Sequence, residues 1–428
     1  MRAKLSTTFQ SLKVRNYRLF AVGQLIKLIG VWMMFIAQDW LVLELSDDSA
    51  TALGVVTALQ FTPVLLLTLL SGRLADRYDK RLLLLIGNAA WSVLALGMSI
   101  LVLSGAAELW HVFVFAALLG IANAVETPVR QAFVSELVGM SLLPNALSLS
   151  AATFNTARIV GPALAGVAIA VFDVGPVFMI SAVSSLAPLL MLARMNAADL
   201  HRQDLPPLDE RAAAKVTDGL KYVARRPDLV MPLVLISVIG MVLFNFQLTL
   251  AALAKTVFNT GAASFGLFTT ALAVGALGGA LASSGRRERP SAYVVIGAAI
   301  AFGALGTLVG LAPAYWLVAL LLLPTGFFMV YFAQASNQRI QLSVDPAYRG
   351  RVMALWVLVF LGTNPIGAPL IGLVAEKFGA GASIWLGGLI SVAAALVALA
   401  WQLRRTGGRL RLRFRPTPQV YVIHAGVS

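Results

Sequence analysis

Five ionisable side chains interrupt the long apolar stretches of this sequence, and they are the residues best placed to do chemistry. Lys27, Asp39, Glu126, Arg130 and Arg158 each have mostly apolar neighbours along the chain. Ionisable groups inside membrane-spanning segments are costly, and they mark substrate paths, ion paths and proton relays. Glu126 and Arg130 are four residues apart, so on a helix they share one face and can pair.

Two carboxylates are candidates for carrying protons. Asp39 lies in the outer part of the first apolar stretch, where burial would favour a protonated carboxyl group, unless the outer surface is close enough to hydrate it. Glu126 is the second candidate, although its position also fits a structural pair or gate with Arg130. Arg158 could neutralise Glu126 across a helix interface. Lys27 could bind an anionic group of a substrate or pair with a carboxylate, and the sequence leaves both open.

Amide side chains inside the apolar stretches are candidates for lining a substrate cavity, together with Lys27 and Arg158. A largely apolar cavity with a few amides suits an amphiphile better than a sugar, because a sugar requires more hydrogen-bonding groups. We select five amides on this criterion: Asn155, Asn245, Gln247, Gln334 and Asn337.

The sequence shows no motif typical of an enzyme active site. It contains no cysteine, and its three histidines are far apart. No phosphate-binding P-loop is present. The net charge of +14 lies in short links rather than in a patch interleaved with aromatic residues, which argues against a nucleic-acid partner. We therefore expect no metal, no cofactor and no enzyme activity.

The segments that hold the candidate residues are long enough to cross a membrane. The chain is 59% hydrophobic and only 12% charged, whereas soluble domains carry about 25% charged residues. A helix needs about 20 apolar residues to span the hydrocarbon core. The sequence predicts an all-α membrane protein with twelve spans, at 17–43, 52–75, 81–104, 110–133, 146–172, 176–194, 229–254, 263–284, 291–311, 314–340, 351–374 and 381–403.

The links between these spans alternate in charge. The N-terminal segment, the central link and the tail are rich in Lys and Arg, whereas the opposite links are short and carry Asp47, Asp48, Glu108 and Asp173. The positive-inside rule places the basic side in the cytoplasm. We expect a multi-pass protein of the cytoplasmic membrane with both termini inside, surrounded by lipid.

The chain carries an internal duplication. Three glycine pairs share an offset of 206 residues: Gly120 with Gly326, Gly161 with Gly367, and Gly166 with Gly372. A repeat in which each half has six spans is a parallel repeat. We predict two pseudo-symmetric six-helix halves at 1–194 and 229–403, a cytoplasmic linker with an amphipathic helix at 195–228, and a basic tail at 404–428.

The link after the second predicted span carries a motif with a recognisable family resemblance. Its sequence, Gly72-Arg73-Leu74-Ala75-Asp76-Arg77-Tyr78-Asp79-Lys80-Arg81, resembles the loop motif of the major facilitator superfamily. The segments 37–45, 127–133 and 157–162 are similar to one branch of that superfamily, the bacterial drug and siderophore exporters that include the enterobactin exporter.

This resemblance implies the major facilitator fold, alternating access, and a cavity lined by the first, fourth, seventh and tenth spans. It also implies a cytoplasmic latch between the halves, for which the candidates are Gly72, Asp76, Arg77, Arg81 and Arg130. Gly161, Pro162 and Gly166 partly resemble a motif of proton-driven antiporters. A proline kink with small residues that permit close helix packing explains the same three residues equally well.

The function expected from these features is secondary active transport. We expect a monomeric, proton-coupled exporter of a small amphiphilic compound such as a drug, a siderophore or a secondary metabolite. Two alternatives remain open: an importer or facilitator of the same fold, and a ligand-sensing membrane scaffold that does not transport.

Overall fold

The computed structural model describes residues 9–201, 216–284, 288–345, 348–413 and 419–424. Within these ranges its description of side chains leaves out 68–70, 72–73, 75–76, 216–219 and the two strands. The first half of the chain forms η1 (Gln10–Lys13), α2 (Arg15–Leu45), α3 (Ala50–Arg77), α4 (Lys80–Leu103), α5 (Leu109–Phe172), α6 (Val174–Ser184), α7 (Leu186–Ala193) and η2 (Ala197–Asp199).

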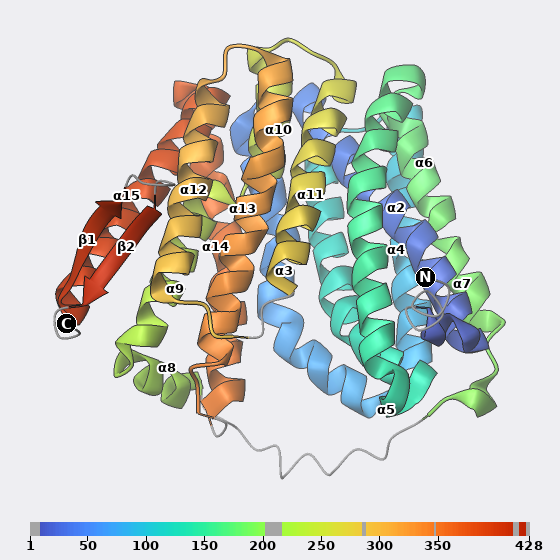
Figure 1. Ribbon diagram of the computed structural model, residues 1–428. Helices are drawn as coiled ribbons and strands as arrows, with labels where there is room; N and C mark the ends of the chain where they lie inside the picture. Colours follow the sequence, from blue (N-terminus) through green and yellow to red (C-terminus); the bar gives the residue numbers. More distant parts are fainter. Residues whose placement is uncertain (1–8, 202–215, 285–287, 346–347, 414–418, 425–428) are drawn as a thin grey trace.

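The second half of the chain is also mainly helical, and it ends in an antiparallel hairpin (Figure 1). Its elements are α8 (Val216–Ala224), α9 (Pro227–Leu243), α10 (Phe246–Ala252), the π-helical turn η4 (Leu253–Val257), α11 (Ala262–Ser284), α12 (Ala292–Leu311), α13 (Tyr315–Gln341), α14 (Arg349–Phe378), α15 (Ala380–Thr406), β1 (Gly408–Arg413) and β2 (Gln419–His424). We call α2–α7 the first helix group and α9–α15 the second helix group.

Several helices begin at residues whose side chains satisfy the free amides of a first turn. Ser49 accepts a hydrogen bond from the Ala52 amide, and Asp79 accepts one from the Leu82 amide. Such N-caps stabilise a helix by about 1 kcal/mol. Because Asp79 caps α4 and α3 continues to Arg77, the predicted link 73–81 is reduced to two residues between helices.

Eleven helical segments among the described residues are long and apolar enough to cross a membrane. One of them, α5, has 64 residues, and a straight helix of that length would measure roughly 96 Å, about three times the hydrocarbon thickness. The helix is broken at Gly139, where φ is 68° and ψ is 175°. Its two arms meet there, at the bottom of Figure 1. These arms correspond to the predicted spans 110–133 and 146–172. Because both arms belong to one of the eleven segments, the count of twelve spans stays a prediction.

The predicted span 229–254 is divided rather than continuous. Helix α9 ends at Leu243, α10 begins at Phe246, and the segment finishes in the π-helical turn η4. The interruption places Asn245 at the start of α10, where its amide nitrogen donates to the Met241 carbonyl at 3.0 Å. Breaks of this kind are tolerated inside a membrane protein where other groups satisfy the freed backbone.

The two ends of the helix bundle differ in their contacts. We call the end that carries Asp48 the Asp48 end, and the opposite end, at the bottom of Figure 1, the Arg81 end. At the Asp48 end, the Lys255 ammonium lies 2.8 Å from Asp48. The Glu376 carboxylate accepts hydrogen bonds from the Ser49 hydroxyl at 2.7 Å and the Thr51 amide at 2.9 Å. These contacts join the two helix groups, so the bundle is closed at the Asp48 end.

Glycines let the two helix groups approach closely. A Cβ atom on Gly266 of α11 would lie 2.5 Å from the Pro162 carbonyl oxygen of α5, and one on Gly372 of α14 would lie 2.5 Å from the Ala50 carbonyl oxygen of α3. Small residues allow such backbone contact between membrane helices. The pairs α5–α11 and α3–α14 therefore form the packed seam between the groups.

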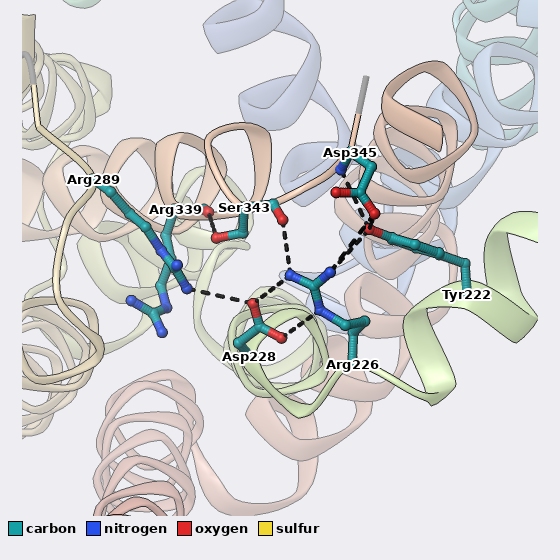
Figure 2. A network of polar contacts seen from close by, with 7 residues as sticks. All are labelled: Tyr222, Arg226, Asp228, Arg289, Arg339, Ser343 and Asp345. Carbon is teal, nitrogen blue, oxygen red and sulfur yellow. Dashed lines mark hydrogen bonds and ion pairs between the residues drawn. The ribbon is translucent and has the colours of Figure 1, made fainter. Parts of the chain in front are cut away.

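Helix α8 is attached to the second helix group at the Arg81 end. The Tyr222 hydroxyl donates to Asp345 at 2.7 Å (Figure 2). The Tyr222 ring stacks on Tyr348, with ring centroids 4.3 Å apart. The pKa of Tyr222 is raised above its ordinary value, mainly by desolvation and to a smaller extent by the hydrogen bond to Asp345. The hydrogen bond to Asp228 raises the pKa of Arg226. The phenol therefore stays protonated, and the guanidinium stays charged, at physiological pH.

Candidate functional site

A cavity of about 780 Å³ lies among α2, α3, α4, both arms of α5 and α14. Its lining residues lie in the middle of these helices and toward the Arg81 end. Pockets for small molecules usually measure about 300–1,000 Å³, so this cavity has the size of a ligand site. Most of its wall is apolar, and aromatic rings form a large part of it: Trp32, Phe35, Phe61, Trp91, Phe154 and Phe360.

Three charged residues form a cluster in the cavity wall. The Lys27 ammonium donates to Glu126 Oε2 at 2.6 Å, and the Arg130 Nε atom lies 3.8 Å from Glu126 Oε1. Lys27 is 1% exposed and Glu126 is 7% exposed. The Lys27 ammonium also lies 5.1 Å from the centre of the Trp91 ring, at the range of a cation–π contact. The structure therefore pairs Lys27 with a carboxylate, which is one of the two roles that the sequence left open.

The cluster has one more positive than negative charge. Arg130 is the most exposed of its three members, because 20% of its side chain is accessible compared with 2% for Lys27 and 8% for Glu126. Helix geometry places Arg130 one turn beyond Glu126, on the same face of α5. A ligand in the cavity would therefore meet aromatic and aliphatic surfaces together with one accessible guanidinium. This combination can bind an amphiphile that carries an anionic group.

Polar side chains complete the cavity wall, and sequence reasoning identified only some of them. Asn155 was predicted and lines the cavity. Gln60, Asn123 and Gln131 also line it and were missed. They are amides inside predicted spans, so the criterion that selected Asn155 would have found all three. The aromatic lining had no comparable signal, because aromatic residues occur on every face of a membrane helix.

The four amides predicted from the second helix group lie away from this cavity. Asn245 bonds to the backbone of its own segment, and Asn337 accepts a hydrogen bond from Gln341. Gln334 is exposed. Gln247 bonds to Asp39, as described below. The resemblance had implied that the seventh and tenth spans line the cavity. In this structure the second helix group contributes Phe360 and Leu361 of α14 instead.

Asp39 is buried near the Asp48 end of α2, outside the cavity. It is 5% exposed, and its Oδ2 atom accepts a hydrogen bond from Gln247 Nε2 at 2.8 Å. This hydrogen bond joins α2 to α10 and thus links the two helix groups. Among the residues that the structure describes, Asp39 has no ion pair. Asp39 and Glu126 therefore differ in kind, because Glu126 is held by a cation and Asp39 by an amide.

Arg158 lies on the second arm of α5, half-buried and outside the cavity wall. It forms no ion pair with any residue that the structure describes. The sequence allowed Arg158 to neutralise Glu126, but the structure gives that role to Lys27, with Arg130 in the second position. Sequence separation could not distinguish these partners, because the choice depends on how each helix is rotated in the bundle.

The residues of the predicted latch are only partly described. The surroundings of Gly72 and the Asp76 side chain lie outside what the structure describes, and Arg77 is exposed. Arg81 donates to the Ala193 carbonyl at 3.3 Å, and its neighbour Lys80 lies 2.7 Å from Glu136. These contacts of Lys80 and Arg81 remain within the first helix group. The fifth latch residue, Arg130, lies in the cavity wall.

The Gly161-Pro162-Gly166 segment lies where the second arm of α5 packs against two helices. A Cβ atom on Gly161 would meet the Trp32 side chain of α2, and one on Gly166 would lie 3.0 Å from the Ala263 Cα atom of α11. Pro162 is inside the helix between them. This geometry is the close helix packing that the sequence allowed as the alternative to an antiporter motif. No cluster of metal-binding side chains occurs among the described residues.

Comparisons with known proteins agree with this architecture. A family model described as "Transmembrane secretion effector" matches residues 6–419. The staphyloferrin A transporter of Staphylococcus aureus is 26% identical over 363 residues, which cover 82% of this chain and 87% of that protein. The enterobactin exporter EntS of Citrobacter koseri is 23% identical over 400 residues, which cover 91% of this chain and 92% of that protein.

Solved structures share the fold. The crystal structure of a POT family transporter in complex with 5-aminolevulinic acid has a TM-score of 0.72 and covers 92% of this chain and 97% of its own. Because the two sequences are only 12% identical, the similarity concerns the fold and not the ligand. The comparison therefore supports the helix arrangement and leaves the ligand open.

Proposed function

The chain belongs to the transmembrane secretion effector family of major facilitator transporters, and on that basis we propose that it exports a small amphiphilic compound with an anionic group. The family and its relatives establish a multi-pass membrane transporter for small molecules, and not an enzyme. The direction of transport, its energy source and the class of substrate are our proposals.

The cavity near Arg130 is the observation that supports this substrate class. Its wall combines aromatic rings with a charge cluster that has one excess positive charge. In a site with a low dielectric, one uncompensated guanidinium attracts an anion more strongly than it would in water. The relatives named as carriers of staphyloferrin A and enterobactin are siderophore transporters by name. A siderophore, or a drug-like molecule with an acidic group, is consistent with this wall.

The proposed energy source is the inward movement of protons, with Asp39 as the carrier. Buried carboxyl groups in membrane proteins commonly take part in proton relays. Asp39 is buried, lacks an ion pair among the described residues, and contacts Gln247 of the other helix group. A change in its protonation would therefore act at the contact between the groups. Glu126 is the weaker candidate, because Lys27 stabilises its ionised form.

The proposed orientation places the Arg81 end in the cytoplasm. Basic residues concentrate in the links at that end, in agreement with the positive-inside rule. With this orientation the cavity is on the cytoplasmic side and the closed Asp48 end faces outward. An exporter would load its substrate in this arrangement. We propose that the chain acts as a monomer.

The test is the accumulation of fluorescent amphiphiles in efflux-deficient bacteria that express the chain. The panel should contain anionic and cationic probes of matched size, each measured with and without an uncoupler. We expect lower accumulation of the anionic probes, reversed by the uncoupler. Arg130→Gln should weaken export of the anionic probes selectively, whereas Arg18→Gln, which removes an exposed charge at the start of α2, should not.

Other results would point elsewhere. Increased accumulation would indicate import. Unchanged accumulation, with binding of a probe to the purified protein and no flux in liposomes, would support a scaffold that does not transport. Equal export of cationic and anionic probes would contradict the proposed role of Arg130 while leaving export intact.

A further inference from the structure

A second hollow lies on the outer surface of the second helix group, between α9 and α15. This groove has a volume of about 330 Å³ and apolar walls, among them Val230, Val234, Val397 and Trp401. Val234 is 53% exposed and Val397 is 70% exposed. Since the protein spans a membrane, these exposed apolar side chains face the hydrocarbon. The groove lies near the start of α9 and the end of α15, so it belongs to the lipid leaflet at the Arg81 end.

A cluster of arginines lies at the Arg81 end of the same two helices. Asp228 of α9 accepts hydrogen bonds from Arg226 at 3.0 Å and from Arg289 at 3.4 Å. Figure 2 shows Arg289 and Arg339 on one side of this carboxylate and Arg226 on the other. Arg226 has a second acidic neighbour in Asp345, at 3.9 Å. On the far side of Asp228, Arg289 pairs with that carboxylate, whereas Arg339 has no ion pair among the residues that the structure describes.

Arg339 is the buried member of the cluster. It is 8% exposed, and one terminal nitrogen donates to the Pro290 carbonyl at 2.9 Å. Its Nε atom is buried without a hydrogen-bond partner among the described residues. A guanidinium is costly to bury unless it is paired. Arg339 therefore has unmet capacity for an anion.

The end of α15 brings a further arginine to this place. The Tyr293 and Thr406 hydroxyls lie 3.3 Å apart, which holds the end of α15 against the start of α12. Pro290, the hydrogen-bond partner of Arg339, lies two residues before α12 begins at Ala292. Arg405 lies over the Trp401 ring, 5.6 Å from its centre, and Trp401 is part of the groove wall. The arginine cluster and the groove are therefore adjacent.

We propose that the groove and the arginines form one binding site for an anionic phospholipid. An acyl chain would occupy the groove between α9 and α15, and the phosphate would lie among Arg289, Arg339 and Arg405. Basic pockets between membrane helices bind anionic headgroups in this way. The apolar groove favours a lipid over a free anion, because it continues from the arginines along the lipid-facing surface.

The test uses the full-length protein in nanodiscs of phosphatidylcholine with increasing phosphatidylglycerol, followed by native mass spectrometry of the lipids that remain bound. We expect one phosphatidylglycerol molecule to be retained. Each guanidinium removed should weaken its retention roughly fivefold, so Arg289→Gln with Arg405→Gln should remove most of it. Both side chains are exposed, so the double variant should fold. Arg404→Gln is the matched control, because it removes the same charge from the neighbouring residue.

A second variant tests the groove independently of charge. Val234→Trp should fill the groove and reduce retention while leaving the arginines in place. Equal loss in Arg404→Gln would show that the basic surface attracts lipid without a defined site, and would overturn the proposal. Retention that is unaffected by Val234→Trp but displaced by excess inorganic phosphate would assign the arginines to a free anion, which also overturns it.

Discussion

The Lys27 ammonium and the Glu126 carboxylate lie 2.6 Å apart in the cavity wall, although 99 residues separate them in the chain. Both side chains are almost fully buried, and Arg130 lies 3.8 Å from the other oxygen of Glu126. Glu126 therefore has two cations, whereas Lys27 has one carboxylate among the described residues. The two partners of this ion pair are not equivalent, and their removal should have unequal effects.

Glu126→Gln should destabilise the protein more than Lys27→Gln. The first change leaves Lys27 buried next to Arg130 without a carboxylate, and an uncompensated buried charge costs about 3–5 kcal/mol. After the second change Arg130 can still neutralise Glu126, so we expect a smaller loss. The measurement is the thermal unfolding temperature of each purified variant in the same detergent.

The double variant Lys27→Met with Glu126→Gln provides the control. It removes both buried charges, and it should unfold close to the temperature of the wild type, since replacing a buried pair with uncharged residues is often neutral. Equal unfolding temperatures for the two single variants would show that Arg130 does not share Glu126.

Much of the architecture could be predicted from the sequence because hydrophobic length alone determines where a chain can cross a membrane. The span predicted at 263–284 corresponds to α11 (Ala262–Ser284), and the span predicted at 291–311 corresponds to α12 (Ala292–Leu311). The Glu126–Arg130 contact was also predicted, since helix geometry places residues four apart on one face. These features depend on short stretches of sequence.

The features that could not be predicted depend on how distant helices are rotated and packed. The Lys27–Glu126 pair joins α2 to α5, and the Asp39–Gln247 hydrogen bond joins α2 to α10. Neither has a local signal. The helical path through Gly139 was also missed, because a single glycine with positive φ can turn the chain without a polar loop. No proline or glycine stands at Phe244 or Asn245 themselves to indicate where the span 229–254 is divided.

Asp39→Asn should uncouple transport from the proton gradient. Asparagine keeps an oxygen that can accept the Gln247 hydrogen bond, but it cannot bind and release a proton at neutral pH. In proteoliposomes we expect gradient-driven transport to be lost, while exchange of labelled for unlabelled substrate without a gradient continues. Asp47→Asn is the matched control, because Asp47 is an exposed aspartate at the same end of the bundle. Gradient-driven transport by Asp39→Asn at the rate of wild type would exclude Asp39 as the proton carrier.

Glu376→Gln should weaken the closure at the Asp48 end. The Glu376 carboxylate accepts two hydrogen bonds at the start of α3, where the positive end of the helix dipole favours an anion. Neutralising it should cost about 1–2 kcal/mol, which changes the ratio of open to closed molecules by a factor of about 5–30. The native chain has no cysteine, so spin labels at Asp47→Cys and Phe378→Cys can report the distance between the two helix groups.

The labelled Glu376→Gln variant should show a larger population at long distance than the labelled parent. Lys377→Gln is the control, since it changes the adjacent exposed residue at the same end of α14. Identical distance distributions in the parent and in Glu376→Gln would mean that the Glu376 hydrogen bonds do not hold this end closed.

Gly266→Ala should disturb the seam between the helix groups. A Cβ atom at this position would lie 2.5 Å from the Pro162 carbonyl oxygen and 3.0 Å from the Gly166 Cα atom. Both contacts are with backbone, so α5 and α11 would have to separate, and overpacking of this kind costs about 1–3 kcal/mol. We expect a lower unfolding temperature. When Gly266→Ala is introduced into the spin-labelled parent, we also expect more molecules to be open at the Asp48 end than in the parent itself. The reason is that the seam between α5 and α11 joins the two helix groups.

Gly97→Ala separates this effect from the helix propensity of alanine. Gly97 lies within α4, and a Cβ atom there would have no neighbour within 4 Å. Alanine at that site should stabilise the helix by roughly 0.5–1 kcal/mol, so the two Gly→Ala changes should shift the unfolding temperature in opposite directions. If Gly266→Ala also raised the unfolding temperature, α5 and α11 would have room for a methyl group. The close contact between the helix groups would then not be what holds the Asp48 end closed.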